Sequence, residues 1–283
     1  MSTVESIVQL IRETSSSLPE DVLAALRRAL RREAKGSSAA VVLRTILDNC
    51  ALAKKLGSPL CQDTGTLTFF VDGRLRRKVA PSVVRKAVAL ATARGYLRKN
   101  CIDSLDGRSY DDNCAVGAPV IHYLESPVLS RPSVTLLMKG GGSENMSRQY
   151  SLPDSSLGAG RDLEGVRKCV LDAVQKIQGY GCAPGILGVC IGGDRATGFE
   201  VAKEQLLRPL DERQPGDQVI GRFEKRLLRE ANTLGIGPMG LGGRTTLLGV
   251  KVASRPRVPA SFFVTVAYMC WACRRRTTVL EDK

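Results

Sequence analysis

The sequence predicts an α+β fold in which a helical N-terminal region is followed by a mixed β-sheet with flanking helices. Residues 1–57 show apolar side chains at helical spacing with no strand-like run. Residues 58–283 instead alternate short runs rich in Val, Ile and Leu with longer amphipathic segments, and glycine-rich loops separate them. With 283 residues, we expect one large domain made of this helical lead-in and this α+β part.

Three helices are expected in the lead-in. Residues 4–14 repeat apolar side chains along one helical face. A second helix begins near Pro19, whose early position suits a helix start, and ends before Gly36. A third helix covers residues 39–56, where Gly57 stops it. These helices lead directly to the loop that contains Cys61.

The α+β part alternates strands with helices, and glycine-rich loops lie next to several of the strands. The loops contain residues 139–145, 182–185 and 235–243. Such loops either make tight turns or bring backbone N–H groups close to a ligand. Strands are expected at 67–71, 120–124, 134–138, 186–191, 245–253 and 262–269, and helices at 81–100, 162–178, 198–207 and 217–234.

The net charge indicates that a binding partner would be anionic, but it does not say which kind of anionic partner. Forty-two basic and 28 acidic residues give a net charge of +14, which suits nucleic acid, an acidic protein or an anionic metabolite. Because no aromatic residues interleave with the basic runs, we expect no nucleic-acid binding, but a basic nucleic-acid-binding protein stays as an alternative. No apolar run approaches a membrane span, and the N-terminus lacks the pattern of a signal peptide. We therefore expect a cytoplasmic protein without a membrane partner.

The nine cysteines are expected to be reduced thiols, because the chain carries no export signal. Cys50 and Cys169 lie in helical patterns and are expected to be buried apolar side chains. Cys61 and Cys182 fit that explanation poorly, since both lie in loops rich in glycine and proline. With His122 as the sole histidine, a His-rich zinc site is poorly supported. Thiolates do suit an iron–sulfur cluster, although the wide spacing of these cysteines does not identify its ligands.

The run of glycines at 235–240 matches the letters of a dinucleotide-binding fingerprint but not its context. That fingerprint requires a strand before it and a helix after it, whereas a predicted helix precedes this run and more glycine follows. The sequence also lacks a phosphate-binding loop of the G-x-x-x-x-G-K-[ST] type. A nucleotide cofactor is therefore not expected.

Five motifs together resemble one enzyme family. They are PLCQDTGT, KGGGSENMS, GCAPGILGVCIGG, NTLGIGPMGLGG and AYMCWACRR, in this order. They resemble the class I (iron–sulfur) fumarate hydratase and L-tartrate dehydratase family, specifically its alpha subunit. The likeness extends from about Leu43 to Arg276, so the resemblance makes the whole chain, 1–283, a single catalytic alpha-subunit domain.

The resemblance implies a [4Fe–4S] cluster held by three cysteines, with one iron left open for substrate. The matching residues are Cys61, Cys182 and Cys270. A cluster with four protein ligands would instead mark a non-catalytic cluster carrier. An open iron can act as a Lewis acid on a bound carboxylate and hydroxyl group.

The resemblance also implies substrate-side residues. Gln62 and Asp63 would line the site beside the cluster, and Arg98 would pair with a substrate carboxylate. Gly140, Gly141 and Gly142 would let the backbone approach the substrate closely. Asp63 is the local candidate for acid/base catalysis, although the main acid/base is expected on another subunit. The polar loop at 110–119 departs from the family pattern, so no site residue is expected there.

The function implied is that of an alpha subunit of fumarate hydratase, which adds water to fumarate to give L-malate. An L-tartrate dehydratase or a mesaconate-type hydratase is the alternative within the class. Because the chain ends at Lys283, where single-chain members continue, we expect a separate beta subunit and a hetero-oligomer such as a heterotetramer.

Overall fold

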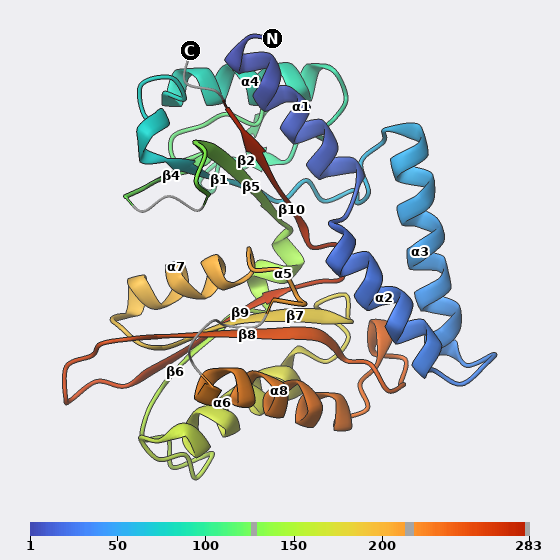
Figure 1. The fold of residues 1–283 in the computed structure, drawn as a ribbon, viewed down its shortest axis with the longest axis vertical. Coiled ribbons are helices and arrows are strands. Elements are labelled where there is room, and N and C mark those ends of the chain that lie inside the picture. Colours follow the sequence, from blue (N-terminus) through green and yellow to red (C-terminus); the bar gives the residue numbers. More distant parts are fainter. Residues whose placement is uncertain (126–128, 213–217, 281–283) are drawn as a thin grey trace. The chain divides into compact units, whose positions relative to one another are not determined.

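The computed structural model describes residues 1–125, 129–212 and 218–280, and it has the expected α+β architecture (Figure 1). The chain forms two compact units. Unit 1 consists of Met1–Pro19, Asp48–Gly141 and Ala272–Lys283, and unit 2 of Glu20–Leu47 and Gly142–Trp271.

Unit 1 is built on a four-stranded mixed sheet with the strand order β10-β5-β1-β4. The central strand β1 runs parallel to β4 and antiparallel to β5, and β10 pairs antiparallel with the other edge of β5. Nearly every residue of β1 and β5 is buried, as expected for central strands rich in Leu, Val and Phe. The bounds are β1 Thr66–Asp72, β4 Val120–Leu124, β5 Ser133–Lys139 and β10 Arg274–Val279.

Helices α1 (Thr3–Ser16) and α4 (Pro81–Ala93) supply the rest of the unit 1 core. Ser2 caps α1 by accepting a hydrogen bond from the Glu5 N–H at 3.3 Å, and Pro81 occupies the first turn of α4. The two helices pack against each other, and their apolar faces share one core with the sheet. This packing buries the apolar face predicted for residues 4–14.

Unit 2 is built on a second four-stranded mixed sheet with the order β6-β9-β7-β8. Strand β7 lies parallel to β8 and antiparallel to β9, which in turn pairs antiparallel with β6. The register pairs Ile186 with Met269, so the start of β7 lies beside the end of β9. The bounds are β6 Arg148–Ser151, β7 Gly185–Gly192, β8 Leu247–Arg255 and β9 Phe263–Met269.

Helices cover both faces of the unit 2 sheet (Figure 1). Helices α6 (Leu163–Ile177) and α8 (Gln218–Thr233) share an apolar core with one face, and α7 (Arg195–Gln205) packs against the other. Asp162 and Asp194 cap α6 and α7 by accepting hydrogen bonds from backbone N–H groups of the first turn. The remaining long helices are α2 (Glu20–Arg32) in unit 2 and α3 (Ser38–Leu56), whose residues divide between the two units.

The structure differs from the expected elements in three respects. Helix α4 ends at Ala93 rather than near residue 100, because Gly95 adopts a left-handed conformation with φ of 74°. Strands β6 and β10 were not expected, and short elements occur in the loops. The latter are η1 (Gly73–Leu75), β2 (Cys101–Ile102), β3 (Ser109–Tyr110), α5 (Gly141–Asn145) and η2 (Pro238–Gly240). Among the described residues, no helix combines the length and apolar character that a membrane span needs.

Candidate active site

One end of the unit 1 sheet brings Asp63 and Gly140 together. Because β1 and β5 are antiparallel and Thr66 pairs with Lys139, the segment before β1 meets the segment after β5. Gly65 has a φ of 74°, and a side chain there would collide with the Lys139 carbonyl, so only glycine fits. A Cβ atom on Gly140 would lie 2.7 Å from Asp63 Oδ2, so any larger residue there would force the Asp63 carboxylate to move.

The Asp63 carboxylate is held by hydrogen bonds to both oxygens. Oδ2 accepts from the Gly141 N–H at 2.7 Å, and Oδ1 accepts from Asn100 Nδ2 at 3.2 Å. The neighbouring Gln62 side chain is exposed, and its Oε1 lies 3.6 Å from Cys61 Sγ. The structure thus brings together Gln62, Asp63, Gly140 and Gly141. For Gly142, a Cβ atom would meet nothing within 4 Å, and no steric need for glycine is evident.

Arg98 lies in the loop after α4, with an exposed side chain and a firmly held backbone. The buried Thr64 hydroxyl accepts from the Arg98 N–H and donates to the Arg98 carbonyl, both at 3.0 Å. The guanidinium group is therefore free to reorient on an anchored main chain. Lys99 next to it pairs with Asp111 at 3.0 Å, so its charge is already partly compensated.

Asn113 organises this loop, although sequence reasoning assigned it no role. Its side chain is 5% exposed, and its Nδ2 donates to the Arg98 carbonyl at 2.9 Å and to Thr92 Oγ1 at 3.0 Å. Its Oδ1 accepts from the Asn100 N–H at 2.7 Å. Asn113 thereby fixes the main chain of the residue that in turn contacts Asp63.

A pocket of about 460 Å³ opens beside these groups in unit 1. Its walls include Asp63, Asn100 and Asn113, and residues 117–120 complete one side. The pocket therefore presents a carboxylate and two amides, together with the Gly141 backbone. Hydrogen-bonding groups of this kind suit a small polar ligand.

Arg274, which sequence reasoning also passed over, is buried near the same carboxylate. The side chain is 2% exposed, and its Nε and Nη1 atoms have no hydrogen-bond partner among the described residues. Its Nη2 atom lies 3.9 Å from where a Gly140 Cβ would be, next to Asp63. Because arginine is always charged, Arg274 places a buried positive charge near the Asp63 carboxylate.

In unit 2, the loops that carry Cys182 and Cys270 meet at one end of the sheet. Cys182 precedes β7 and Cys270 follows β9, and these strand ends are paired. The Trp271 N–H donates to the Cys182 carbonyl at 3.3 Å. The glycine-rich loop before β8 joins them, because the Met239 N–H donates to the Ala183 carbonyl at 2.9 Å.

The segment after the glycines at 140–142 is also tied to this end of unit 2. Ser143 is buried, and its Oγ accepts a hydrogen bond from the Cys270 N–H at 3.1 Å. Ser147 Oγ accepts from the Tyr268 N–H at 3.2 Å. The glycine-rich segments 139–145, 182–185 and 235–243 therefore all reach residues beside a candidate cysteine.

Tyr268 is the side chain around which the Cys182 loop folds. Methyl groups on Gly181 or Gly185 would overlap its ring, so both positions require glycine. The hydroxyl group is buried and has no hydrogen-bond partner among the described residues. Burial raises the pKa of Tyr268 well above its ordinary value, and Cys270 and Cys182 add to the shift.

The three cysteines expected to bind a cluster differ in exposure and environment from most of the others. Cys182 is exposed, and Cys61 and Cys270 are partly exposed. Burial raises the pKa of the Cys50, Cys114 and Cys190 thiols to about 11 and that of Cys169 to about 12. Burial raises the pKa of Cys101 as well. Because the thiolate is the form that binds metal, these five are poor ligands.

Thiolates are the donors that hold an iron–sulfur cluster, so the chemistry of the three candidate cysteines suits one. Cys61 belongs to unit 1, and Cys182 and Cys270 belong to unit 2. Within the described ranges, no group of three or more His, Cys, Asp or Glu side chains is arranged to hold a metal ion. The three-cysteine ligand set stays a prediction, supported by accessible sulfur atoms and by a buried hydroxyl beside two of them.

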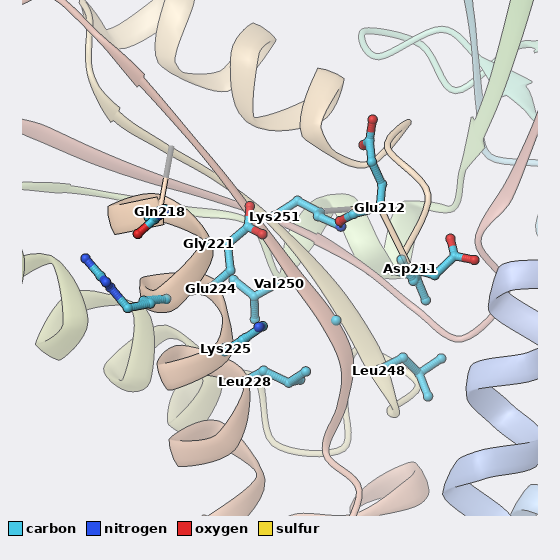
Figure 2. Close-up of a pocket in the computed structure, with 13 residues that line it drawn as sticks. Asp211, Glu212, Gln218, Gly221, Glu224, Lys225, Leu228, Leu248, Val250 and Lys251 are labelled. Carbon is cyan, nitrogen blue, oxygen red and sulfur yellow. The ribbon is translucent and has the colours of Figure 1, made fainter. Parts of the chain in front are cut away.

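A slightly larger pocket, of about 480 Å³, lies elsewhere in unit 2, between α8 and the edge strand β8 (Figure 2). Its two buried charged side chains, Lys251 and Glu224, already have partners. Lys251 Nζ donates to the Glu212 carbonyl at 2.7 Å, and Glu224 accepts from the Val252 N–H at 2.8 Å and from Arg208 at 3.0 Å. None of the predicted site residues lines it, so pocket size alone does not locate the chemistry.

Comparison with known proteins identifies the family of the chain. The model of the fumarate hydratase (Fumerase) family matches residues 4–279, nearly the whole chain. The chain belongs to the fumarate hydratase family. The resemblance inferred from the five motifs is therefore confirmed.

Individual relatives of the fumarate hydratase family differ in length. The chain is 48% identical over 276 residues to "Putative fumarate hydratase class I" of Geobacillus stearothermophilus, covering 96% of this chain and 53% of that protein. It is 30% identical over 280 residues to the L(+)-tartrate dehydratase subunit alpha of Escherichia coli K12, covering 98% of this chain and 90% of the subunit. The chain thus spans about half of the first relative and most of the second.

Proposed function

We propose that this chain is the alpha-type catalytic part of a [4Fe–4S]-dependent hydro-lyase, and that its reaction is the reversible hydration of fumarate to L-malate. The observation that carries the proposal is the match to the fumarate hydratase family over residues 4–279. The similarity to a class I fumarate hydratase at 48% identity favours fumarate as substrate.

Cys61, Cys182 and Cys270 would hold the cluster. None of the three cysteines is fully buried, which supports this assignment, and burial raises the pKa of five of the other thiols, which makes those five poorer ligands. When bound, the cluster would supply an open iron that acts as a Lewis acid on the substrate's carboxylate and hydroxyl oxygens.

The chain's own residues would bind and orient a dicarboxylate. The Arg98 guanidinium would pair with one carboxylate, and its anchored main chain limits the positions that the side chain can reach. Gln62 would donate an amide hydrogen bond, and the glycines at 140–142 would allow close approach. Asp63 is already held through both oxygens, which suits a positioning role better than proton transfer. The principal acid/base would belong to a beta subunit.

L-Tartrate dehydratase is the second candidate, because the chain covers 90% of an L(+)-tartrate dehydratase subunit alpha. The same comparison supports a separate beta subunit, since a protein named as subunit alpha implies a partner. Hydration of mesaconate is a third substrate within the same chemistry. We further propose a cytoplasmic hetero-oligomer such as a heterotetramer.

Anaerobic reconstitution with iron and sulfide tests the cluster. We expect the wild-type chain to show visible absorbance typical of an iron–sulfur cluster and, after one-electron reduction, an EPR signal. Cys61→Ser, Cys182→Ser and Cys270→Ser should each lose iron, whereas the matched controls Cys50→Ser and Cys169→Ser should keep it. A full cluster in Cys182→Ser would refute the ligand set, and four protein ligands would favour a cluster carrier.

The substrate is tested with the reconstituted alpha–beta pair. Values of kcat/KM for fumarate, L-tartrate and mesaconate should rank fumarate first. A higher kcat/KM for L-tartrate would instead favour L-tartrate dehydratase as the function. No turnover of any of the three by a pair with an intact cluster would overturn the proposed reaction class.

A further inference from the structure

The Tyr268 hydroxyl is a buried polar group without an evident structural purpose. The side chain is 1% exposed, and the hydroxyl has no hydrogen-bond partner among the described residues. Leaving such a group unpaired costs free energy, and phenylalanine would fill the same space without that cost. A tyrosine here therefore suggests that its O–H group has a partner in the working protein.

The position of Tyr268 indicates where that partner would be. Tyr268 belongs to the unit 2 core, and Cys270, two residues later and just beyond the end of β9, packs against the same core. The ring also contacts the loop of Cys182 so closely that Gly181 and Gly185 tolerate no side chain. Two of the proposed cluster ligands thus border a single tyrosine.

We propose that Tyr268 is a positioning residue for the cluster: its ring shapes the Cys182 loop, and its hydroxyl donates a hydrogen bond to sulfur once the cluster is bound. The inference rests on the proposed function for the cluster itself. Hydrogen bonds to the sulfur atoms of such a cluster help to set its reduction potential and its retention. The hydroxyl would then be unpaired only in the protein without its cluster.

The conservative variant Tyr268→Phe tests this in two states. In the cluster-free protein, we expect an unchanged or higher melting temperature, because an unpaired hydroxyl is removed without changing the ring. Tyr150→Phe is the matched control in the same unit, since Tyr150 donates to Asp172 Oδ2 at 2.7 Å. Loss of that hydrogen bond should lower the melting temperature by about 2–4 °C.

In the reconstituted protein, we expect Tyr268→Phe to change the properties of the cluster and Tyr150→Phe to leave them unchanged. Tyr268→Phe should bind the cluster but shift its reduction potential to a more negative value, because a hydrogen bond to sulfur stabilises the reduced state. It should also lose iron to a chelator several-fold faster than wild type. Tyr150→Phe should match wild type in both measurements.

The outcomes separate this inference from the proposed function. An unchanged reduction potential and unchanged iron loss in Tyr268→Phe would overturn the role of the hydroxyl. A melting temperature that falls in cluster-free Tyr268→Phe as far as in Tyr150→Phe would show that the hydroxyl is already bonded, and would overturn that role as well. Failure of the wild-type chain to bind any cluster would instead overturn the proposed function.

Discussion

The exposed guanidinium and the anchored main chain of Arg98 allow a direct prediction about substrate binding. Replacement by alanine removes a guanidinium group from an exposed position without touching the main-chain hydrogen bonds to Thr64. We expect Arg98→Ala to raise the KM for the dicarboxylate at least ten-fold, with the cluster spectrum unchanged. Steady-state kinetics of the alpha–beta pair measure this effect.

The control for Arg98 is its neighbour Lys99, whose side chain is 59% exposed and paired with Asp111. Lys99→Ala removes the same charge one residue away and should leave KM within two-fold of wild type. Equal effects of the two substitutions would point to general electrostatic attraction and would remove Arg98 from the binding site.

The hydrogen bonds and the backbone conformation of Asn113 allow a prediction about the free energy of unfolding. Its side chain fixes the residues at 98 and 100 and Thr92 with three hydrogen bonds, and its φ of 60° is one that alanine adopts at a cost. Asn113→Ala should therefore lower the free energy of unfolding by about 2–4 kcal/mol. Urea denaturation of the cluster-free chain measures the change.

A second substitution separates the two contributions of Asn113. Glycine adopts a positive φ without strain, so Asn113→Gly should lose the hydrogen bonds alone and be less destabilising than Asn113→Ala. If the two variants were equally stable, backbone strain would contribute nothing at this position. A wild-type stability in both would show that the hydrogen bonds are dispensable.

At the scale of elements, periodicity predicted the long helices and the buried strands, and the structure confirms them. The pattern at residues 162–178 became α6 (Leu163–Ile177), and the run at 120–124 became β4 (Val120–Leu124). Strand β10 was missed because its sequence, RRRTTV, offers no apolar alternation. It becomes a strand by pairing with β5, a contact between residues far apart in the chain.

For the candidate site, the sequence identified loops of unusual composition, and the site residues stay a prediction. Cysteines in glycine-rich loops marked Cys61 and Cys182, and the structure shows that Gly181 and Gly185 are required by the Tyr268 ring. The roles of Asn113 and Tyr268 were not predictable, because each depends on partners brought close only by folding. The polar loop at 110–119 gave no periodic signal, although Asn113 within it is one of the best-bonded side chains of unit 1.

The turn after β1 allows a prediction of how the stability of the chain depends on pH. The buried Asp72 carboxylate caps η1, accepting from the Arg74 N–H at 3.0 Å and pairing with the Arg74 guanidinium at 2.6 Å. The hydrogen bond from Arg74 holds the pKa of Asp72 below its ordinary value. Because the folded-state pKa is lowered, this stabilisation is present above the unfolded pKa of about 4 and is lost as the pH falls through the folded pKa.

Asp72→Asn should therefore destabilise the chain more at pH 7 than at about pH 3. Since the Arg74 side chain is 43% exposed, we expect solvent screening to limit the difference to about 1 kcal/mol. Asp111→Asn provides the control, because that carboxylate is 73% exposed and the same charge change should have little effect. Denaturation curves at the two pH values measure both variants; a difference independent of pH would contradict the linkage.

At the scale of the whole molecule, the net charge of +14 is compatible with an anionic substrate, an acidic partner subunit or nucleic acid. The structure adds an argument against nucleic acid. Among the residues that the structure describes, six cation–π pairs place a basic side chain over an aromatic ring, as with Arg195 over Phe263 and Arg257 over Phe262. A cation over a ring occupies one of the two faces on which a base could stack.

The final prediction tests whether the chain binds nucleic acid. A labelled single-stranded RNA should bind the cluster-free chain weakly at an ionic strength of about 0.01 M and lose detectable binding at about 0.15 M, because only phosphate contacts hold it and salt screens them. Fluorescence anisotropy measures the binding at both salt concentrations. Submicromolar affinity that persists at the higher concentration would require contacts to bases, and would favour a nucleic-acid-binding protein over an enzyme whose positive charge attracts a dicarboxylate.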